Sequence, residues 1–281
     1  MLNPNLIKKK SKELDIPFDN LLMGCCLEEL LVFISENNRD DLWLINDRSL
    51  GLESYKRGFN DTLIAAYNGE DDMETFMRKL SLSVVSYFMN LGVKVKTEFL
   101  ADNHIQFLLQ ILNMEVPVIL VVQAPREVNT FPREKSFNLS LENAKAVHYM
   151  EYPLEEKAAE LAFDILDKLE LLNEMHEYID LYDLLKAETV EGRKVEESLS
   201  GKCKEKPGFD MARFEKLQSY SNYTYMKKKW KRLKRATKRN DLEWEEVHGL
   251  VVKFLEPIYK AIVDEEVFFG DWIPEIARFL D

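Results

Sequence analysis

The first half of the chain alternates between helical and extended patterns of apolar residues. Apolar side chains recur every three or four positions in three segments, which predicts amphipathic helices over residues 6–14, 20–35 and 73–91. Three other segments are short apolar runs or alternate with period two, which predicts strands over residues 41–45, 93–99 and 116–122. The simplest packing of these elements is a small mixed sheet with flanking helices.

The second half has a helical pattern almost throughout. Helical spacing predicts helices over residues 154–169, 174–187, 211–218, 225–237 and 244–263. The polar segment 198–207, which contains glycine and proline, is expected to interrupt this series. The change of pattern near Pro153 predicts two domains, a sheet domain over residues 1–152 and a helical bundle over residues 153–281. The predicted fold class is therefore α+β.

Composition limits the compartment and the class of protein. The chain has 281 residues, of which 46% are hydrophobic, enough for one large core or two ordinary ones. Its longest apolar runs, such as residues 27–34, fall short of the ~18–20 residues that cross a bilayer. The basic residues 8–10 are not followed by the apolar stretch of a signal peptide. We therefore expect a cytoplasmic protein without a membrane segment.

The three cysteines indicate reduced thiols. Cys25 and Cys26 are adjacent and fall within a predicted helix, and Cys203 is isolated. This spacing suits neither a disulfide framework nor a metal site, so we expect buried, unmodified side chains.

Positive charge is concentrated in one segment, although the net charge is −12. Between Lys227 and Arg239 the chain has nine basic residues and no acidic one. One interpretation is a solvated helix face that balances the acidic remainder; the other is a surface for the phosphates of nucleic acid or of a nucleotide. In the second interpretation, aromatic side chains for base stacking are available at Tyr223, Tyr225 and Trp230. The candidate nucleic-acid-binding residues are Lys227, Lys228, Lys231, Lys234 and Arg235.

Two pairs of acidic residues share predicted helix faces. Glu156 and Glu160 are four residues apart, and Asp180 and Asp183 are three apart. A solvated surface accounts for such pairs, whereas four carboxylates directed at one place would require a cation.

Several motifs follow one another in the order found in a known protein family. They are residues 16–22 (Ile-Pro-Phe-Asp-Asn-Leu-Leu), 27–31 (Leu-Glu-Glu-Leu-Leu), 42–49 (a strand followed by Asn-Asp-Arg-Ser), 57–63 (Arg-Gly-Phe-Asn-Asp-Thr-Leu), 156–161 and 177–184. In this order and spacing the chain resembles the AbiEii-type nucleotidyltransferase-like proteins, which are toxins of phage-defence toxin–antitoxin systems. The resemblance covers most of the chain.

The resemblance implies a nucleotidyltransferase-like fold and transfer of a nucleoside monophosphate from a nucleoside triphosphate to an RNA or protein hydroxyl. It implies Mg²⁺ as cofactor and RNA or a cognate antitoxin protein as partner. It implies a catalytic role for Asp61, with Glu98 on a neighbouring strand as a stand-in for a second acid, and metal binding by Asp47 and Asp61. The implied nucleotide-binding residues are Asn46, Arg48, Ser49, Lys56, Arg57, Asp180 and Asp183.

The chain departs from the family's motifs where catalysis needs them. Leu63 stands where a second strand carboxylate is expected, and Asn46 and Asp47 replace the glycines that let the turn approach a phosphate. Gln123 or Val122 stands where a third acid is expected. The helical cations of the family are replaced by Leu161, Glu177 and Ile179.

These departures define two alternative functions. Loss of one charge-stabilising group typically costs about 10²- to 10³-fold in rate, so ordinary turnover is not expected when several are lost. The pairs Asp40–Asp41 and Asp71–Asp72 are alternative metal donors, but neighbouring residues on a strand point to opposite faces. The chain is then either a nucleotidyltransferase with a displaced site or a catalytically degenerate module that binds protein or nucleic acid.

Overall fold

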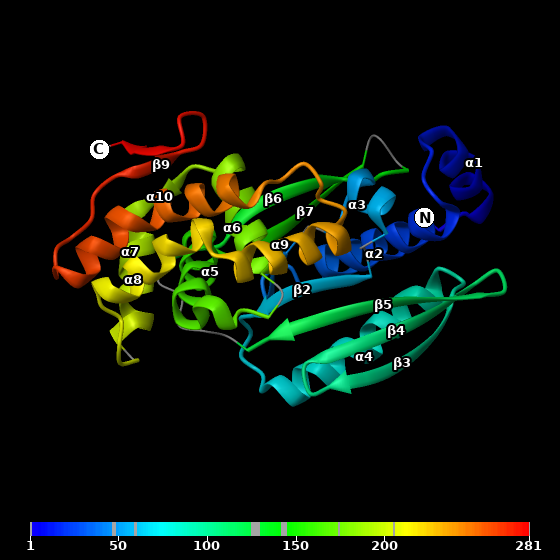
Figure 1. Ribbon diagram of the computed structural model, residues 1–281. Helices are drawn as coiled ribbons and strands as arrows, with labels where there is room; N and C mark the ends of the chain where they lie inside the picture. Colours follow the sequence, from blue (N-terminus) through cyan, green and yellow to red (C-terminus); the bar gives the residue numbers. More distant parts are fainter. Residues whose placement is uncertain are drawn as a thin grey trace. The chain divides into compact units, whose positions relative to one another are not determined.

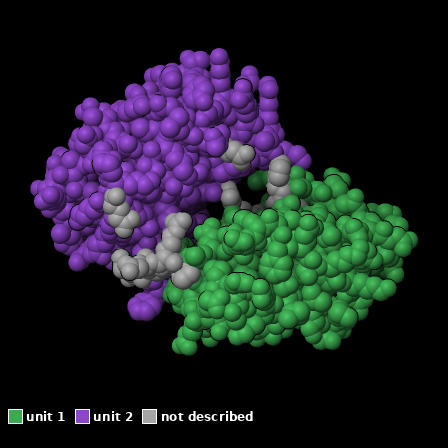
Figure 2. Space-filling view, turned by 90° about the horizontal axis from the view of Figure 1, so that it is seen from below, with its two compact units in different colours: residues 1–127, 132–152 green, residues 128–131, 153–281 purple. Residues whose placement is uncertain are grey.

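The chain forms two compact units in its computed structural model, which describes residues 2–46, 49–58, 61–124, 130–141, 145–173, 175–204 and 206–280. Unit 1 comprises Met1–Glu127 and Pro132–Tyr152, and unit 2 comprises Val128–Phe131 and Pro153–Asp281 (Figure 2). Unit 1 contains a seven-stranded mixed sheet with helices packed on it, and unit 2 is mainly helical. The predicted fold class is confirmed.

The elements of unit 1 begin with two helices and end with two paired strands (Figure 1). In chain order they are α1 (Pro4–Leu14), α2 (Phe18–Asn37), β1 (Leu42–Asn46), α3 (Leu52–Arg57), β2 (Thr62–Tyr67), α4 (Met73–Asn90), β3 (Lys94–Ala101), β4 (His104–Ile111), β5 (Met114–Gln123), β6 (Arg133–Asn138) and β7 (Ala146–Glu151). Helix α3 and strands β4, β6 and β7 were not anticipated from the sequence.

The strands of unit 1 follow the order β3-β4-β5-β2-β1-β7-β6. Strand β2 is parallel to β5 and β1 is parallel to β7, while the other neighbours are antiparallel. Helix α3 connects β1 to its antiparallel neighbour β2. This connection places the end of β1 beside the start of β2, with Asn46 opposite Ile64.

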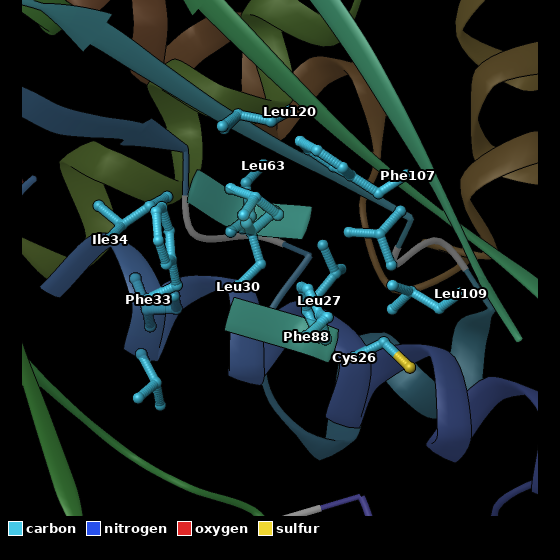
Figure 3. Close-up of a cluster of buried hydrophobic side chains, with 14 of the residues drawn as sticks. Cys26, Leu27, Leu30, Phe33, Ile34, Leu63, Phe88, Phe107, Leu109 and Leu120 are labelled. Carbon is cyan, nitrogen blue, oxygen red and sulfur yellow. The ribbon is translucent and has the colours of Figure 1, made fainter. Parts of the chain in front are cut away.

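Helix α2 is the core helix of unit 1, since thirteen of its twenty residues are buried. Alternation along the strands directs every second side chain toward it. Figure 3 shows Leu63 of β2 and Leu120 of β5 gathered with Leu27 and Leu30 of α2. The opposite face of these strands carries half-buried side chains.

Helix α3 packs against α2 at Gly24. A Cβ atom at this glycine would lie 2.5 Å from the ring of Tyr55. The Tyr55 hydroxyl donates to the buried carboxylate of Glu28 at 2.6 Å, and Glu28 also accepts from the backbone N–H of Ser140 at 3.0 Å. Burial raises the pKa of Glu28 despite these donors. The contacts fix α3 on the core helix.

Unit 2 consists of six α-helices and a small sheet within the described residues. The helices are α5 (Leu154–Lys168), α6 (His176–Ala187), α7 (Gly192–Lys204), α8 (Met211–Gln218), α9 (Thr224–Thr237) and α10 (Trp244–Val263). Three short strands, β8 (Val190–Glu191), β9 (Asp271–Ile273) and β10 (Arg278–Leu280), form the sheet in the order β10-β9-β8. Short 3-10 helices follow α5 (η1, Leu169–Leu171) and α8 (η2, Ser219–Asn222).

The interruption predicted at residues 198–207 begins later than expected, because α7 continues to Lys204 and the described residues 206–210 before α8 are not helical. Leu199 and Cys203 are buried, and the hydroxyl of Ser198 donates to the buried carboxylate of Glu156 on α5 at 2.5 Å. These contacts with α5 outweigh the weak helical propensity of the serines and glycine in the segment.

The cysteines are buried free thiols, as the sequence predicts. Burial raises the pKa of Cys203 to about 12, so this thiol is unreactive near neutral pH. Among the described helices, none has both the length and the apolar character needed to cross a membrane.

Candidate functional site

Unit 1 brings the predicted phosphate-binding turn close to the predicted metal-binding acid. Asn46 ends β1 and Ser49 lies in the turn after it, while Asp61 immediately precedes β2. Because β1 and β2 are antiparallel neighbours, these residues lie at the same end of the sheet. The predicted ligands Asp47 and Arg48 lie outside the described residues.

Asp61 is exposed and is held by local contacts. Its carboxylate accepts a hydrogen bond from the Thr62 hydroxyl at 2.9 Å, and its backbone carbonyl accepts from the N–H of Ile119 on β5 at 2.7 Å. The main-chain bond positions the start of β2 on β5. The carboxylate itself remains accessible to solvent.

The strand that follows Asp61 does not supply a second carboxylate. Leu63 is completely buried in the core. On the other face, Thr62 and Ile64 lie beside Ile119 and Val121 of β5. Aliphatic side chains and one hydroxyl are poor ligands for Mg²⁺, which prefers carboxylate oxygens.

Glu98 does not lie near Asp61, which corrects the role assigned to it. Glu98 of β3 lies opposite Gln106 of β4. Gln106 in turn lies opposite Ile119 of β5, and Ile119 lies opposite Thr62 of β2, the residue after Asp61. Three strand spacings of ~4.8 Å give a separation of about 14 Å. Two metal ions of a transfer site are ~3.5–4 Å apart and share ligands, so Glu98 is too distant to serve.

The acidic pair Asp71–Asp72 of unit 1 has structural roles. Asp72 caps α4 by accepting from the backbone N–H of Thr75 at 2.9 Å, and Asp71 binds Lys79 at 2.7 Å. Within the described residues, no group of three or more metal-ligating side chains comes together. The donor set therefore does not fit the metal pair that the family resemblance implies.

The two predicted phosphate-binding cations of α3 lie near its C-terminal end. Lys56 is exposed and pairs with Glu53 at 3.2 Å, one turn earlier on the helix. Arg57 is the last residue of α3. An exposed i,i+3 pair is weak, so Lys56 remains available to an anion.

An ion cluster around the buried Glu151, on neighbouring strands, was missed by sequence reasoning. Glu151 at the end of β7 is bound by Arg133 and Lys135 of β6, each at 3.0 Å. Glu151 lies opposite Leu44 of β1, and its carboxylate is buried. Only the pairing of β6 with β7 brings these residues together, and neither strand has a distinctive pattern.

The acids of α5 and α6 are engaged by α7 and by Arg239, which follows α9, and the nucleotide-binding role of Asp183 stays a prediction. Both oxygens of Asp183 accept from the guanidinium of Arg239, at 2.7 and 3.0 Å. Glu156 binds Ser198, and Glu160 lies 3.9 Å from Lys202 on α7. Asp180 also makes a contact of its own. The four carboxylates do not form one cation site.

Helix α9 carries the basic segment up to Thr237, with Lys238 and Arg239 following it, and part of the segment's charge is used inside unit 2. The internal contacts are Lys227 with Glu245, Lys234 with Glu243, Lys229 with the carbonyls of Glu170 and Leu172, and Arg239 with Asp183. Lys228, Lys231, Arg232 and Arg235 are exposed, and none of the ion pairs among the described residues involves them. Four uncompensated cations thus remain on the helix surface.

A groove of about 410 Å³ runs between α9 and the start of α10. Its polar lining is provided by Lys227, Lys231, Lys234, Arg235, Asn240, Glu243 and Glu245. Trp230 and Trp244 form its apolar base. Trp230 is only 3% exposed and its indole N–H donates to the carbonyl of Leu242 at 3.3 Å, so it is not available for base stacking, contrary to expectation.

Exposed aromatic rings lie at the N-terminal end of α9. Tyr223 is 45% exposed; its ring stacks on Tyr220 at 5.6 Å and tilts toward Tyr225 at 6.0 Å. The ammonium of Lys229 lies 4.8 Å from the centre of the Tyr225 ring. The predicted stacking role is therefore sterically open to Tyr223 and Tyr225.

A second hollow, of about 340 Å³, borders these rings. It is lined by Glu170, Lys216, Ser219, Tyr220, Asn222 and Tyr223. Hydrogen bonds from Lys216 and Tyr220 lower the pKa of Glu170 to about 2, so this carboxylate is charged at physiological pH. Glu170 was missed in the sequence because its partners lie 46 and 50 residues away.

Comparison with known proteins gives limited similarity. No family model matches the chain, and no curated protein matches it. JHP933 from Helicobacter pylori has 13% identity and a TM-score of 0.44, covering 89% of this chain and 96% of that chain. A second Helicobacter pylori structure, provisionally named a nucleotidyltransferase, has 14% identity and a TM-score of 0.42, covering 86% and 95%. TM-scores of this size do not establish a shared fold, so the resemblance to the AbiEii-type family stays a prediction.

Proposed function

We propose that this chain binds single-stranded nucleic acid through α9 and the adjoining groove, on a nucleotidyltransferase-like scaffold whose described residues do not include the paired carboxylates of catalysis. The observation that carries the proposal is the set of exposed, uncompensated cations on α9. They lie on a protein whose net charge is −12 and would otherwise repel nucleic acid.

One row of side chains along α9 has the arrangement that a single strand requires. Tyr223, Lys227, Lys231 and Arg235 are spaced four residues apart. At ~1.5 Å per residue, successive members are about 6 Å apart along one side of the helix. This distance is comparable to the step between phosphates of an extended strand. The row therefore presents one stacking ring followed by three cations.

The aromatic end of the row favours single strands over duplexes. Tyr223 and Tyr225 expose ring surface that can stack on unpaired bases, and such stacking contributes ~1–3 kcal/mol per base. Bases inside a duplex do not offer their faces. Affinity for a single strand should therefore exceed affinity for the same sequence in a duplex.

Neutralising two cations of the row tests the proposal. In the double variant Lys231→Gln/Arg235→Gln, affinity for a fluorescent single-stranded RNA should fall on the order of tenfold at low salt. The dependence of log K on log salt should become less steep by about 1.4, since each phosphate contact on a single strand contributes ~0.7. Fluorescence anisotropy over a salt series measures both quantities.

A charge-matched control separates local contact from net charge. The variant Lys253→Gln/Lys260→Gln removes two exposed cations farther along α10 and should bind like the wild type. Equal effects of the two double variants, or no binding by the wild-type chain, would contradict the proposal.

Nucleotidyl transfer is the second candidate, favoured by the proximity of the Ser49 turn to Asp61 at one end of the sheet. In this candidate Asp61 and Asp47 would bind Mg²⁺, while Ser49, Lys56 and Arg57 would contact the phosphates of a nucleoside triphosphate. The acceptor would be an RNA or protein hydroxyl, as in a toxin-type activity. The candidate is opposed by the aliphatic side chains beside Asp61.

Removing the Asp61 carboxylate distinguishes the two candidates. We expect Asp61→Ala to leave the binding of Mg²⁺ and ATP unchanged in isothermal titration calorimetry, because no second acid of the described strands lies within metal-sharing reach. The isosteric Asp61→Asn serves as a control for shape. A large loss of metal-dependent nucleotide affinity in both variants would support the enzyme instead.

A further inference from the structure

Unit 1 exposes its large apolar side chains in one stretch of the chain, from α4 to the β4–β5 turn. Among its described residues, these side chains are Leu82, Met89, Leu91, Phe99, Leu100 and Leu112. Isolated exposed apolar residues are normal, but a group on neighbouring elements marks a contact surface. Helix α4 packs against β3, so the two elements present their exposed residues in the same region of unit 1.

Strand β3 forms an edge of the sheet in this region. It pairs with β4 on one side and ends the strand order on the other. Seven of its eight residues are exposed, and Phe99 and Leu100 are 49% and 50% exposed. An exposed edge of this length is a template for another strand.

On the opposite edge strand, β6, all three charged residues contact other residues of unit 1, whereas the ion pairs of β3 among the described residues involve only Lys96, which forms an exposed pair with Glu115 of β5 at 3.2 Å. Arg133 and Lys135 bind Glu151, and Glu134 contacts Arg39 and lies 3.4 Å from His148. The charged side chains of β6 therefore already have partners within unit 1, so β3 is the better candidate for pairing with another strand.

The sequence of β3 is complementary to itself in the antiparallel direction. A two-fold axis through Thr97, perpendicular to the sheet, keeps every side chain on its own face. It places Lys96 opposite Glu98 and Val95 opposite Phe99, each pair occurring twice. Moving the axis to Lys96 or to Glu98 would place identical charges opposite each other, which is destabilising.

We propose that β3 pairs with β3 of a second copy of this chain about an axis at Thr97, so that two seven-stranded sheets join into one. A strand pair alone is small compared with the ~1,200–2,000 Å² of a specific interface. Helix α4 packs against β3, and its exposed Leu82 and Met89 are further apolar surface available to a partner. Leu82 is 73% exposed, so its burial would add to the driving force.

A charge swap tests both the partner and the register. Sedimentation equilibrium of the full chain should show a dimer, and Lys96→Glu or Glu98→Lys should each weaken dimerisation at least about tenfold, because like charges then face each other twice. The double variant Lys96→Glu/Glu98→Lys restores opposite charges and should restore the dimer. Lys8→Glu, an equal charge change on the exposed surface of α1, should have no effect.

Cross-linking provides a second measurement that does not depend on charge. Thr97→Cys places two thiols directly opposite each other, with Cβ atoms ~4.5–5.5 Å apart, so mild oxidation should link two copies covalently. Lys94→Cys, which the register places opposite Leu100, should not cross-link, and the native cysteines are buried. A monomeric wild type, single charge variants that still dimerise, a swap that stays monomeric, or equal cross-linking at positions 94 and 97 would each overturn the proposal.

Discussion

Replacing Trp244 with alanine should lower the free energy of unfolding of unit 2 by about 3–5 kcal/mol. The indole N–H of Trp244 donates to the carbonyl of Tyr220 at 3.0 Å, and its ring lies 5.0 Å from Tyr178 and 5.6 Å from Trp230. The alanine variant would lose a large buried ring and one of the two hydrogen bonds that the Tyr220 carbonyl accepts, the other coming from the backbone N–H of Tyr223 at 3.1 Å. Urea denaturation followed by circular dichroism measures the change.

The substitution Tyr178→Phe is the matched control in the same cluster. The Tyr178 hydroxyl is buried and has no hydrogen-bond partner among the described residues. The phenylalanine variant keeps the ring and removes the free-energy penalty of burying a hydroxyl without a hydrogen bond. Its free energy of unfolding should therefore equal or exceed that of the wild type. A Trp244→Ala loss below about 1 kcal/mol, or an equal loss in Tyr178→Phe, would show that the cluster does not carry the stability of the unit.

Gly24→Ala should destabilise unit 1 by about 2 kcal/mol, although glycine to alanine in a helix is ordinarily favourable by ~1 kcal/mol. The new Cβ atom would lie 2.5 Å from the Tyr55 ring. The ring cannot move away easily, because Tyr55 is buried and its hydroxyl is bound to Glu28 at 2.6 Å. Overpacking of ~3 kcal/mol therefore exceeds the gain in helix propensity.

The same substitution at Gly249 of α10 provides the control. A Cβ atom there meets nothing within 4 Å, so Gly249→Ala should stabilise unit 2 by ~0.5–1 kcal/mol. Thermal unfolding of the two variants should shift in opposite directions. Stabilisation by Gly24→Ala would mean that α3 is not held against α2 as described.

The helices of unit 2 were the most predictable part of the fold. The predicted ranges 211–218 and 244–263 coincide with α8 and α10, whose apolar stripes have clear helical spacing. Helix α7 was missed in part because its serines and glycine have low intrinsic propensity, and burial against α5 decides its length.

The strands of unit 1 were less predictable. Strands β3 and β5 have strong patterns and were expected, with ends that differ by a few residues. Strand β7 buries the charged residue Glu151, which pattern reasoning treats as a surface signal. Its compensation by Arg133 and Lys135 depends on pairing with β6 and is not visible along the chain.

In the candidate site, too, residue types could be read from the sequence, whereas distances between residues that are far apart along the chain could not. The substitution of Leu63 for an acid is visible in the sequence, and the structure explains it as a core residue. The distance of Glu98 from Asp61 depends on strand order, which the sequence does not contain. The pairing of Asp183 with Arg239 joins residues 56 positions apart, so the sequence could not show that this acid is already bound.

The two carboxylates in the groove have a consequence for selectivity. Glu243 and Glu245 hold Lys234 and Lys227 where incoming phosphates would otherwise sit, so occupation of these positions is an exchange of one anion for another. A lone mononucleotide gains little from such an exchange. If the groove binds nucleic acid as proposed, a polymer reaches the unoccupied cations and the tyrosines simultaneously, and chain length is then the property by which the groove discriminates among ligands.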